Sequence, residues 1–222
     1  MKFVITGTSQ GIGLEFTKQV LKDGHHVLAI ARPSSHLQEL RSLIEKYPRT
    51  LSLIEIDLAE EKALSLIESR VEEVGAVDVL INNAGVYGKS DSRDDFDQSF
   101  LVNSTIPYLL TQSLLPSLKQ SSAPKLVLIS SQMGSIQDAS GGSYSYRASK
   151  AALNMMGKCF SLDHPWLTTL IFHPGWVQTN MGGGAAPVLP HDSVKGMLKL
   201  IYAAGAKDSG KYQTFEGARL NW

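Results

Sequence analysis

A tyrosine and a lysine four residues apart, Tyr146 and Lys150, are of the types that transfer protons. Residues at i and i+4 share one face of a helix, so a helical conformation would place the Lys150 ammonium beside the Tyr146 phenol. A phenol ordinarily loses its proton near pH ~10, and a neighbouring cation favours the phenolate and lowers that pKa. The i+4 partner of Tyr144 is Ala148, which carries no charge. We therefore expect Tyr146, and not Tyr144, to be a tuned acid or base.

A glycine-rich segment near the N-terminus, TGTSQGIG at residues 6–13, has the composition of a phosphate-binding loop. It follows the apolar, β-branched stretch KFVIT and opens a stretch with helical periodicity. Glycines let the backbone turn tightly and approach a ligand closely. The free N–H groups and partial positive charge of a helix N-terminus favour a pyrophosphate. Strand, glycines and helix in this order predict a dinucleotide site.

The segments that must position these residues alternate between strand-like and helix-like patterns along the chain. Strands are predicted at residues 2–6, 26–31, 51–58, 77–82, 125–131, 167–173 and 210–217, and helices at residues 14–24, 34–48, 60–75, 94–120, 144–162 and 191–206. The helix at 34–48 has a serine cap and a proline stop, and the helix at 94–120 contains prolines. Six or seven strands with crossover helices predict an α/β fold, a single Rossmann-like, doubly wound parallel sheet over residues 1–222.

Sites in such sheets lie beyond the carboxyl ends of the strands. The glycine-rich or polar segments at those ends are residues 7–13, 82–85, 130–131 and 174–175. We expect these four segments to meet at one edge of the sheet and to form the site.

Composition limits the classes of partner. Of the 222 residues 43% are hydrophobic, enough for one large domain with a substantial core. Lys+Arg and Asp+Glu both number 21, and this zero net charge argues against nucleic acid or an anionic membrane as main partner. The single Cys159 excludes an internal disulfide framework and a multi-cysteine metal site. With no apolar run near the roughly 18 residues of a membrane span and no signal peptide, we expect a soluble, cytoplasmic protein.

Taken in order, the motifs resemble those of the short-chain dehydrogenase/reductase family. The glycine loop has the TGxxxGIG form, NNAG stands at 82–85, ISS at 129–131, YRASK at 146–150 and HPGWVQT at 173–179. Asn103 lies in a predicted helix, as the family's catalytic asparagine does. The resemblance runs from about residue 3 to the last residues, and the stretches around Tyr146 and Gly175 are most similar to the carbonyl-reductase and C-factor-like branch.

The resemblance implies four catalytic residues. Tyr146 would exchange a proton with a carbonyl or alcohol oxygen, and Ser131 would hydrogen-bond that oxygen. Lys150 would lower the pKa of Tyr146 and hold the nicotinamide ribose, and Asn103 would anchor a water of a proton relay. Many members place the serine thirteen residues before the tyrosine, which is Met133 here. The SSxxG pattern selects Ser131 instead, with Ser130 as the alternative.

The resemblance also implies a nicotinamide cofactor. In many NAD-specific members an aspartate follows the second strand, seven residues after a glycine; here Gly24 plus seven is Ala31, followed by Arg32. A guanidinium suits a 2′-phosphate, and Ser34 and Ser35 add hydroxyls, so NADP(H) is favoured over NAD(H). Against this, Ser9 and Gln10 are neutral, so the glycine loop carries no second basic residue. Asp57 matches the family's adenine contact, with an N-cap role as the alternative. The expected cofactor residues are Gly7, Ser9, Gln10, Gly11, Ile12, Gly13, Arg32, Asp57, Leu58, Asn83, Ala84, Gly85, Tyr146, Lys150, Pro174, Gly175, Val177 and Thr179.

The function that this resemblance implies is NADP(H)-dependent reduction of aldehydes or ketones. Trp176, Met181 and Tyr87 are candidates for an apolar substrate pocket, and the loop MGGGAAPVLP at 181–190 for a lid. The alternative is a dinucleotide-binding signalling protein of the C-factor-like type; a sugar-nucleotide epimerase fits less well because those chains are longer. Family members often form homodimers or homotetramers through the helices that hold Asn103 and Tyr146.

Overall fold

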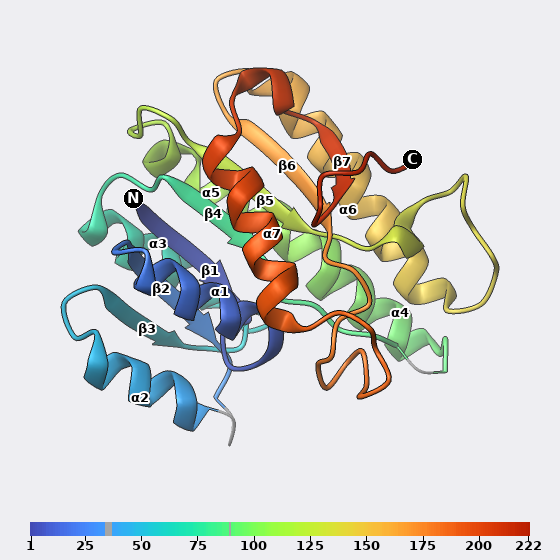
Figure 1. Ribbon diagram of the computed structural model, residues 1–222, viewed down its shortest axis with the longest axis horizontal. Coiled ribbons are helices and arrows are strands. Elements are labelled where there is room, and N and C mark those ends of the chain that lie inside the picture. The colour runs from blue at the N-terminus through green and yellow to red at the C-terminus, as the bar shows by residue number, and fades with distance from the viewer. Residues whose placement is uncertain (34–36, 89) are drawn as a thin grey trace.

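In the computed structural model, the strands of the described residues form one parallel sheet with the order β3-β2-β1-β4-β5-β6-β7 (Figure 1). The structure describes residues 1–33, 37–88 and 90–222. The strands are β1 (Lys2–Thr6), β2 (His26–Ala31), β3 (Leu51–Glu55), β4 (Val79–Asn82), β5 (Lys125–Ile129), β6 (Thr168–His173) and β7 (Lys211–Thr214). The order reverses between β1 and β4, so the two halves of the sheet wind in opposite directions from its middle. The predicted α/β fold, including the last strand, is confirmed.

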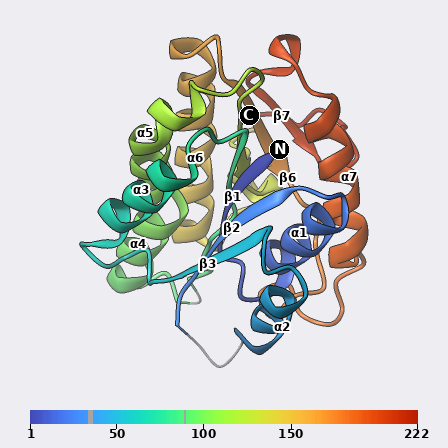
Figure 2. The same cartoon turned by 90° about the vertical axis from the view of Figure 1, so that its left-hand side faces the viewer.

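Helices cover both faces of the sheet. They are α1 (Gly11–Lys22), α2 (Gln38–Lys46), α3 (Ala63–Val74), α4 (Arg93–Phe100), α5 (Ile106–Leu118), α6 (Tyr144–Asp163) and α7 (Pro190–Ala203). Figure 2 shows α1, α2 and α7 on one face, with α3, α4, α5 and α6 on the other. Alternate strand residues point into the two layers, and both layers are apolar: Ile5, Ala29 and Ile81 face the first, Val4, Leu28 and Leu80 the second.

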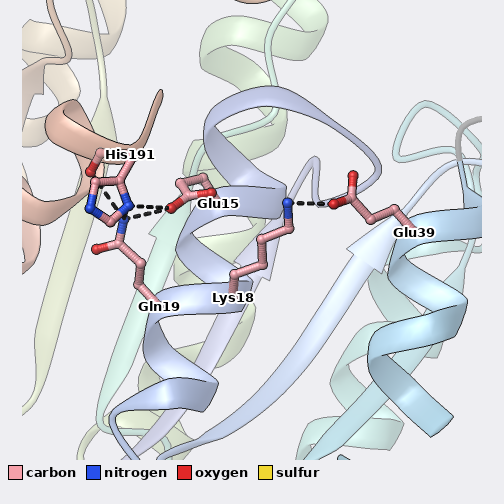
Figure 3. A network of polar contacts seen from close by, with 5 residues as sticks. All are labelled: Glu15, Lys18, Gln19, Glu39 and His191. Carbon is pink, nitrogen blue, oxygen red and sulfur yellow. Dashed lines mark hydrogen bonds and ion pairs between the residues drawn. The ribbon is translucent and has the colours of Figure 1, made fainter. Parts of the chain in front are cut away.

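Charged side chains tie α1 to the helices on either side of it (Figure 3). The Lys18 Nζ atom lies 2.5 Å from Glu39 on α2, and Glu15 Oε1 lies 3.2 Å from His191 Nδ1 on α7. The amide of Gln19 donates to the same Glu15 oxygen over 2.7 Å. These contacts lie at the surface, so each contributes little to stability. They connect α1 with α2 on one side and with α7 on the other.

The long helix predicted over residues 94–120 is interrupted, which corrects that prediction. It ends at Phe100, continues as a π turn over Leu101–Thr105, and resumes as α5 at Ile106. Proline at 107 has no N–H to donate to the carbonyl four residues earlier, and that carbonyl belongs to Asn103. The helix therefore leaves its regular bonding pattern at the residue for which a catalytic role was expected.

Helix α6 explains the face shared by Tyr146 and Lys150. Its buried positions recur at Tyr146, Lys150, Leu153, Gly157 and Phe160, a helical stripe that faces the sheet. At Gly157 a Cβ atom would lie 2.7 Å from the side chains of Ile171 and Leu128, so glycine lets α6 approach the sheet closely. Tyr144, two residues before Tyr146, does not belong to this stripe, and its side chain is 64% exposed. The helical phase predicted from the spacing is confirmed.

Candidate active site

The glycine loop is packed so tightly that side chains are excluded at three of its positions. Gly7 and Gly11 have φ of 70° and 57°, in the left-handed region that glycine adopts without strain. A Cβ atom on Gly13 would lie 2.2 Å from the Gly7 carbonyl oxygen, and one on Gly7 would lie 2.8 Å from Ala84 Cα. The loop therefore packs directly on the NNAG turn after β4.

The glycine loop also leaves the N-terminus of α1 open. Gln10 occupies the cap position with extended backbone, and its side chain makes no capping hydrogen bond; the side-chain oxygen instead accepts from Asn180 Nδ2 over 2.7 Å. The first N–H groups of a helix have no partner within the helix and attract anions. This cradle of glycine backbone and a helix N-terminus fits the pyrophosphate of a dinucleotide.

A cleft of about 330 Å³ runs along the carboxyl edge of the sheet and collects most of the expected cofactor residues. It is lined by these expected residues: Gly7, Ser9, Gln10, Gly11, Ile12, Gly13, Arg32, Asp57, Leu58, Asn83, Ala84, Gly85, Tyr146, Lys150, Pro174 and Thr179. Gly175 and Val177 lie instead on a second, neighbouring hollow. The four segments expected at the strand ends thus meet at one edge of the sheet.

Arg32 lies directly after β2, where Ala31 is buried and the arginine is exposed. It lines the cleft, on the side away from Tyr146 in the sheet order. Ser34 and Ser35, suggested as additional hydroxyl donors, lie outside the described residues, as does the serine cap expected for the helix that begins at Gln38. At the end of β2, the described residues thus provide the guanidinium of Arg32, and the last strand position, Ala31, has no acidic side chain.

Asp57 lines the same cleft, and its alternative role as the N-cap of α3 is excluded. Helix α3 begins at Ala63, with Lys62 in the cap position. The Asp57 carboxylate accepts the N–H of Ala59 over 3.0 Å and so forms a turn of its own.

Tyr146 and Lys150 are both buried, with 8% and 4% of their surface exposed. Lys150 Nζ donates to the Ile129 carbonyl over 2.8 Å and lies 5.8 Å from the centre of the Tyr146 ring. The Tyr87 ring also packs against the Tyr146 ring, with ring centres 4.8 Å apart. The ammonium is thus held at the end of β5 rather than at the phenol oxygen.

The expected lowering of the Tyr146 pKa is not found. Burial raises the pKa of Tyr146 to about 12; a hydrogen bond from Ser131 acts in the opposite direction but is the smaller effect. Burial also lowers the pKa of Lys150 to about 8. Desolvation disfavours the charged form of either group, and it is the largest cause of both shifts. Tyr146 is therefore a protonated phenol at neutral pH, and Lys150 is an ammonium close to its titration range.

The two candidate serines have different surroundings. The Ser130 hydroxyl donates to Asn154 Oδ1 over 2.5 Å, in a buried position. The Ser131 hydroxyl accepts the N–H of Met133 over 3.2 Å and lies near enough to the Tyr146 phenol to oppose the rise of its pKa. The geometry therefore brings Ser131 and Tyr146 together, while Ser130 serves the packing of α6 on β5.

Asn103 is completely buried in the π turn, next to Leu101 and Val102, which line the cleft. Its side-chain oxygen accepts the N–H of Val86 over 2.8 Å, and its amide donates to the Val86 carbonyl and to Ser149 Oγ over 2.9 and 3.0 Å. A Cβ atom on Gly85 would lie 3.2 Å from Asn103 Oδ1 and 3.6 Å from Lys150 Nζ. The side chains of Asn103 and Lys150 therefore both lie next to Gly85.

A second hollow, of about 660 Å³, adjoins the cleft and is also lined by Tyr146. Trp176, Met181 and Tyr87, predicted for an apolar pocket, all line it, and Ser131 does as well. Tyr146 belongs to both hollows, together with Ile12, Ser130, Pro174, Thr179 and Met181. The Tyr146 phenol therefore lies where the glycine-loop cleft and the second hollow meet.

Several lining residues were not predicted. Gln98, Leu101 and Val102 reach the cleft from α4 and the π turn, and Met133, Asp138, Ser140 and Arg147 line the second hollow. Gln98, Leu101, Val102, Asp138 and Ser140 belong to no motif, and Met133 and Arg147 occupy variable positions of the SSxxG and YRASK patterns. A signal existed only for Arg147, which follows Tyr146 directly in the sequence.

Among residues 1–33, 37–88 and 90–222, no helix is both long enough and apolar enough to cross a membrane. Within the same ranges, no group of three His, Cys, Asp or Glu side chains is placed to hold a metal ion.

Comparison with known proteins points to one family. The family model described as short chain dehydrogenase matches residues 2–187. C-signal of Myxococcus xanthus is 40% identical over 156 residues, which cover 67% of this chain and 94% of C-signal. The NADPH-bound carbonyl reductase from chicken fatty liver has a TM-score of 0.94 at 32% identity, over 100% of this chain and 98% of that one. Carbonyl reductase Sniffer of D. melanogaster has a TM-score of 0.94 at 30% identity, over 100% and 99%.

Proposed function

The chain belongs to the short-chain dehydrogenase/reductase family, and from this premise we propose that it reduces aldehydes or ketones with NADPH, with Tyr146 as the proton donor. The observation that carries the proposal is the position of Tyr146, a buried phenol at the junction of the glycine-loop cleft and the second hollow. A dinucleotide in the first cavity and a carbonyl compound in the second would meet at this phenol.

The chemistry of reduction then divides between the cofactor and the chain. A bound nicotinamide supplies the hydride to the carbonyl carbon. Tyr146 donates its proton to the carbonyl oxygen, and Ser131 donates a hydrogen bond to the same oxygen and stabilises its developing charge. Because burial raises the pKa of Tyr146 to about 12, the phenol carries its proton at neutral pH.

Lys150 and Asn103 support the return of a proton to Tyr146. An ammonium with a pKa lowered to about 8 gives up a proton more readily than an exposed lysine. The Asn103 carbonyl lacks the i+4 donor of a regular helix because residue 107 is proline, which leaves it suited to hold a water. We assign these two residues to a relay between Tyr146 and solvent.

The preference for NADP(H) rests on Arg32. The guanidinium lines the cleft after β2, where an acidic residue would repel a 2′-phosphate, and the chicken relative binds NADPH. A hydrogen bond to a charged group contributes about 1.5 to 3 kcal/mol.

The first test is a cofactor titration of wild type and Arg32→Ala by nicotinamide fluorescence. We expect NADPH affinity to fall about 10- to 100-fold in Arg32→Ala while NADH affinity stays the same. Arg93→Ala is the control, because Arg93 is an exposed arginine on α4 that pairs with Asp97. Equal preference of the wild type for NADH would remove the role of Arg32.

Turnover of aldehydes, ketones and quinones then separates the candidate functions. Tyr146→Phe is expected to bind NADPH like the wild type and to lose turnover by a factor of about 10² to 10⁴. The similarity to C-signal supports a signalling role as the second candidate. Tight cofactor binding without turnover of any carbonyl compound would favour that role. The cytoplasmic location and assembly into homodimers or homotetramers stay predictions.

A further inference from the structure

One wall of the second hollow is a loop with few contacts of its own. We call residues 135–142 the pocket loop; Asp138 and Ser140 line the hollow, and residues 136–142 are exposed. Gly141 and Gly142 have φ of 80° and 67°, and a Cβ atom on either would meet no atom within 4 Å. A segment with so little buried surface opens at a low free-energy cost unless other elements hold it.

Arg147 holds the pocket loop from the side of α6. Its Nε donates to the Gly142 carbonyl over 3.0 Å, Nη2 donates to Ser140 Oγ over 2.7 Å, and Nη1 lies 3.4 Å from the Met133 carbonyl. The rigid fork of a guanidinium thus spans the residues before and at the end of the loop. Because Arg147 follows Tyr146 directly on α6, its hydrogen bonds set the position of the loop relative to the phenol.

The last residues of the sequence hold the same loop from outside. The Trp222 carbonyl accepts the N–H of Gln137 over 3.0 Å and the Ser135 hydroxyl over 3.4 Å, and Asn221 Nδ2 donates to Asp138 Oδ1 over 3.2 Å. These three contacts reach the loop at the backbone of Gln137 and at the side chains of Ser135 and Asp138.

The tail formed by Asn221 and Trp222 is itself anchored on β7. The Trp222 ring packs on Tyr212, with ring centres 5.4 Å apart, and Leu220 N donates to the Tyr212 carbonyl over 2.9 Å. Tyr212 is 1% exposed and donates its hydroxyl to the Ser131 carbonyl. One tyrosine therefore fixes both the serine beside Tyr146 and the tail that holds the loop.

We propose that Arg147, Asn221 and Trp222 are positioning residues for the carbonyl substrate, which hold the pocket loop at a set place relative to Tyr146. The inference rests on the proposed function. None of the three lines the cofactor cleft. Loss of a positioning contact should therefore weaken substrate binding and leave cofactor binding alone.

The first test compares steady-state kinetics of wild type, Arg147→Gln, Asn221→Ala and a chain lacking Asn221 and Trp222, with Arg93→Gln as control. We expect KM for the carbonyl compound to rise about three- to tenfold in each of the three test variants, because each loses about one hydrogen bond that holds the pocket loop. The control Arg93→Gln is expected to keep the KM of the wild type. The change in kcat is expected to stay below about threefold, and the affinity for NADPH to stay that of the wild type, which also reports an intact fold.

A second readout does not depend on turnover. In the NADPH-bound protein, hydrogen exchange of the Gln137 amide and of peptides covering residues 135–142 should be faster in Arg147→Gln and in the shortened chain. Unchanged KM together with unchanged exchange would overturn the inference. A rise in KM in Arg147→Gln alone, limited to anionic substrates, would also overturn it by making Arg147 a direct contact.

The two proposals fail in different ways. If the wild type reduces no carbonyl compound, the proposed function fails, and exchange in the pocket loop still decides whether these residues hold it. If the wild type is active and the tail variants match it in KM and exchange, only the positioning role fails.

Discussion

Two adjacent serines, Ser130 and Ser131, show how environment separates residues of identical chemistry. The Ser130 hydroxyl is committed to Asn154, which in turn donates to the Gly134 carbonyl over 3.2 Å. The Ser131 hydroxyl faces Tyr146, and Tyr212 holds its backbone carbonyl. Ser131 is therefore free to serve a bound oxygen, and Ser130 is part of the framework.

The two serines lead to opposite predictions for alanine variants. Ser131→Ala should lower kcat/KM by about 10² to 10³ with unchanged NADPH affinity, the usual effect of removing one donor to a developing oxyanion. Ser130→Ala should keep most of its turnover and lose about 1 to 3 kcal/mol of unfolding free energy, because Asn154 loses a buried partner. Kinetics and urea unfolding of both variants decide; the reverse pattern would make Ser130 the catalytic serine.

At the scale of elements, the glycine loop and α1 act as one unit with the turn after β4. Asn83 Nδ2 donates to the carbonyls of Thr6 and Gly7 over 2.8 and 3.2 Å, and Thr6 Oγ1 accepts the N–H groups of Asn83 and Ala84 over 3.0 Å each. Two strand ends that are neighbours in the sheet are thereby locked before any ligand binds. This rigidity is what a pyrophosphate site requires.

Gly13→Ala tests this packing. The added Cβ would lie 2.2 Å from a backbone oxygen and 2.5 Å from Asn83 Nδ2, so the loop must move. We expect a loss of about 1 to 3 kcal/mol of unfolding free energy and a loss of NADPH binding. Gly205→Ala is the matched control, since a Cβ atom there meets nothing within 4 Å. Normal NADPH affinity in Gly13→Ala would contradict the cradle assigned to this loop.

At the scale of the whole molecule, the site depends on burying two ionisable side chains between α6 and the sheet. Burial lowers the pKa of Lys150 from 10.5 to about 8, so between these values the unfolded chain binds more protons than the folded one. Stability contributed by this group therefore rises with pH across that window. Below pH 8 both states are protonated, and the full cost of the buried ammonium is present.

Lys150→Met isolates this effect. Between pH 8 and 10 the unfolding free energy of the wild type should rise relative to that of Lys150→Met, by up to about 3 kcal/mol. Urea unfolding at several pH values measures the difference. The difference stops growing near pH 10.5, where Lys150 of the unfolded chain also loses its proton. Above pH 10 the raised pKa of Tyr146 makes the stability of both proteins fall alike, so it does not change the difference between them. Parallel pH profiles for the two proteins would contradict the assignment.

Features that depend on local spacing could be predicted from the amino-acid sequence. The helical period places Tyr146 and Lys150 on one face, and the glycine spacing sets the turn between β1 and α1. The alternation of strands and helices determines the parallel sheet, and with it the edge where the four motif segments meet. These patterns need only the geometry of the backbone.

Features that depend on contacts between distant segments became visible in the folded chain. Burial against Tyr87 and β5 raises the pKa of Tyr146, where the neighbouring cation alone predicted a fall. Packing distinguishes Ser131 from Ser130, and Pro107 turns the helix at Asn103 into a π turn. Desolvation, packing and long-range hydrogen bonds depend on which segments the fold brings together, so no local pattern encodes them.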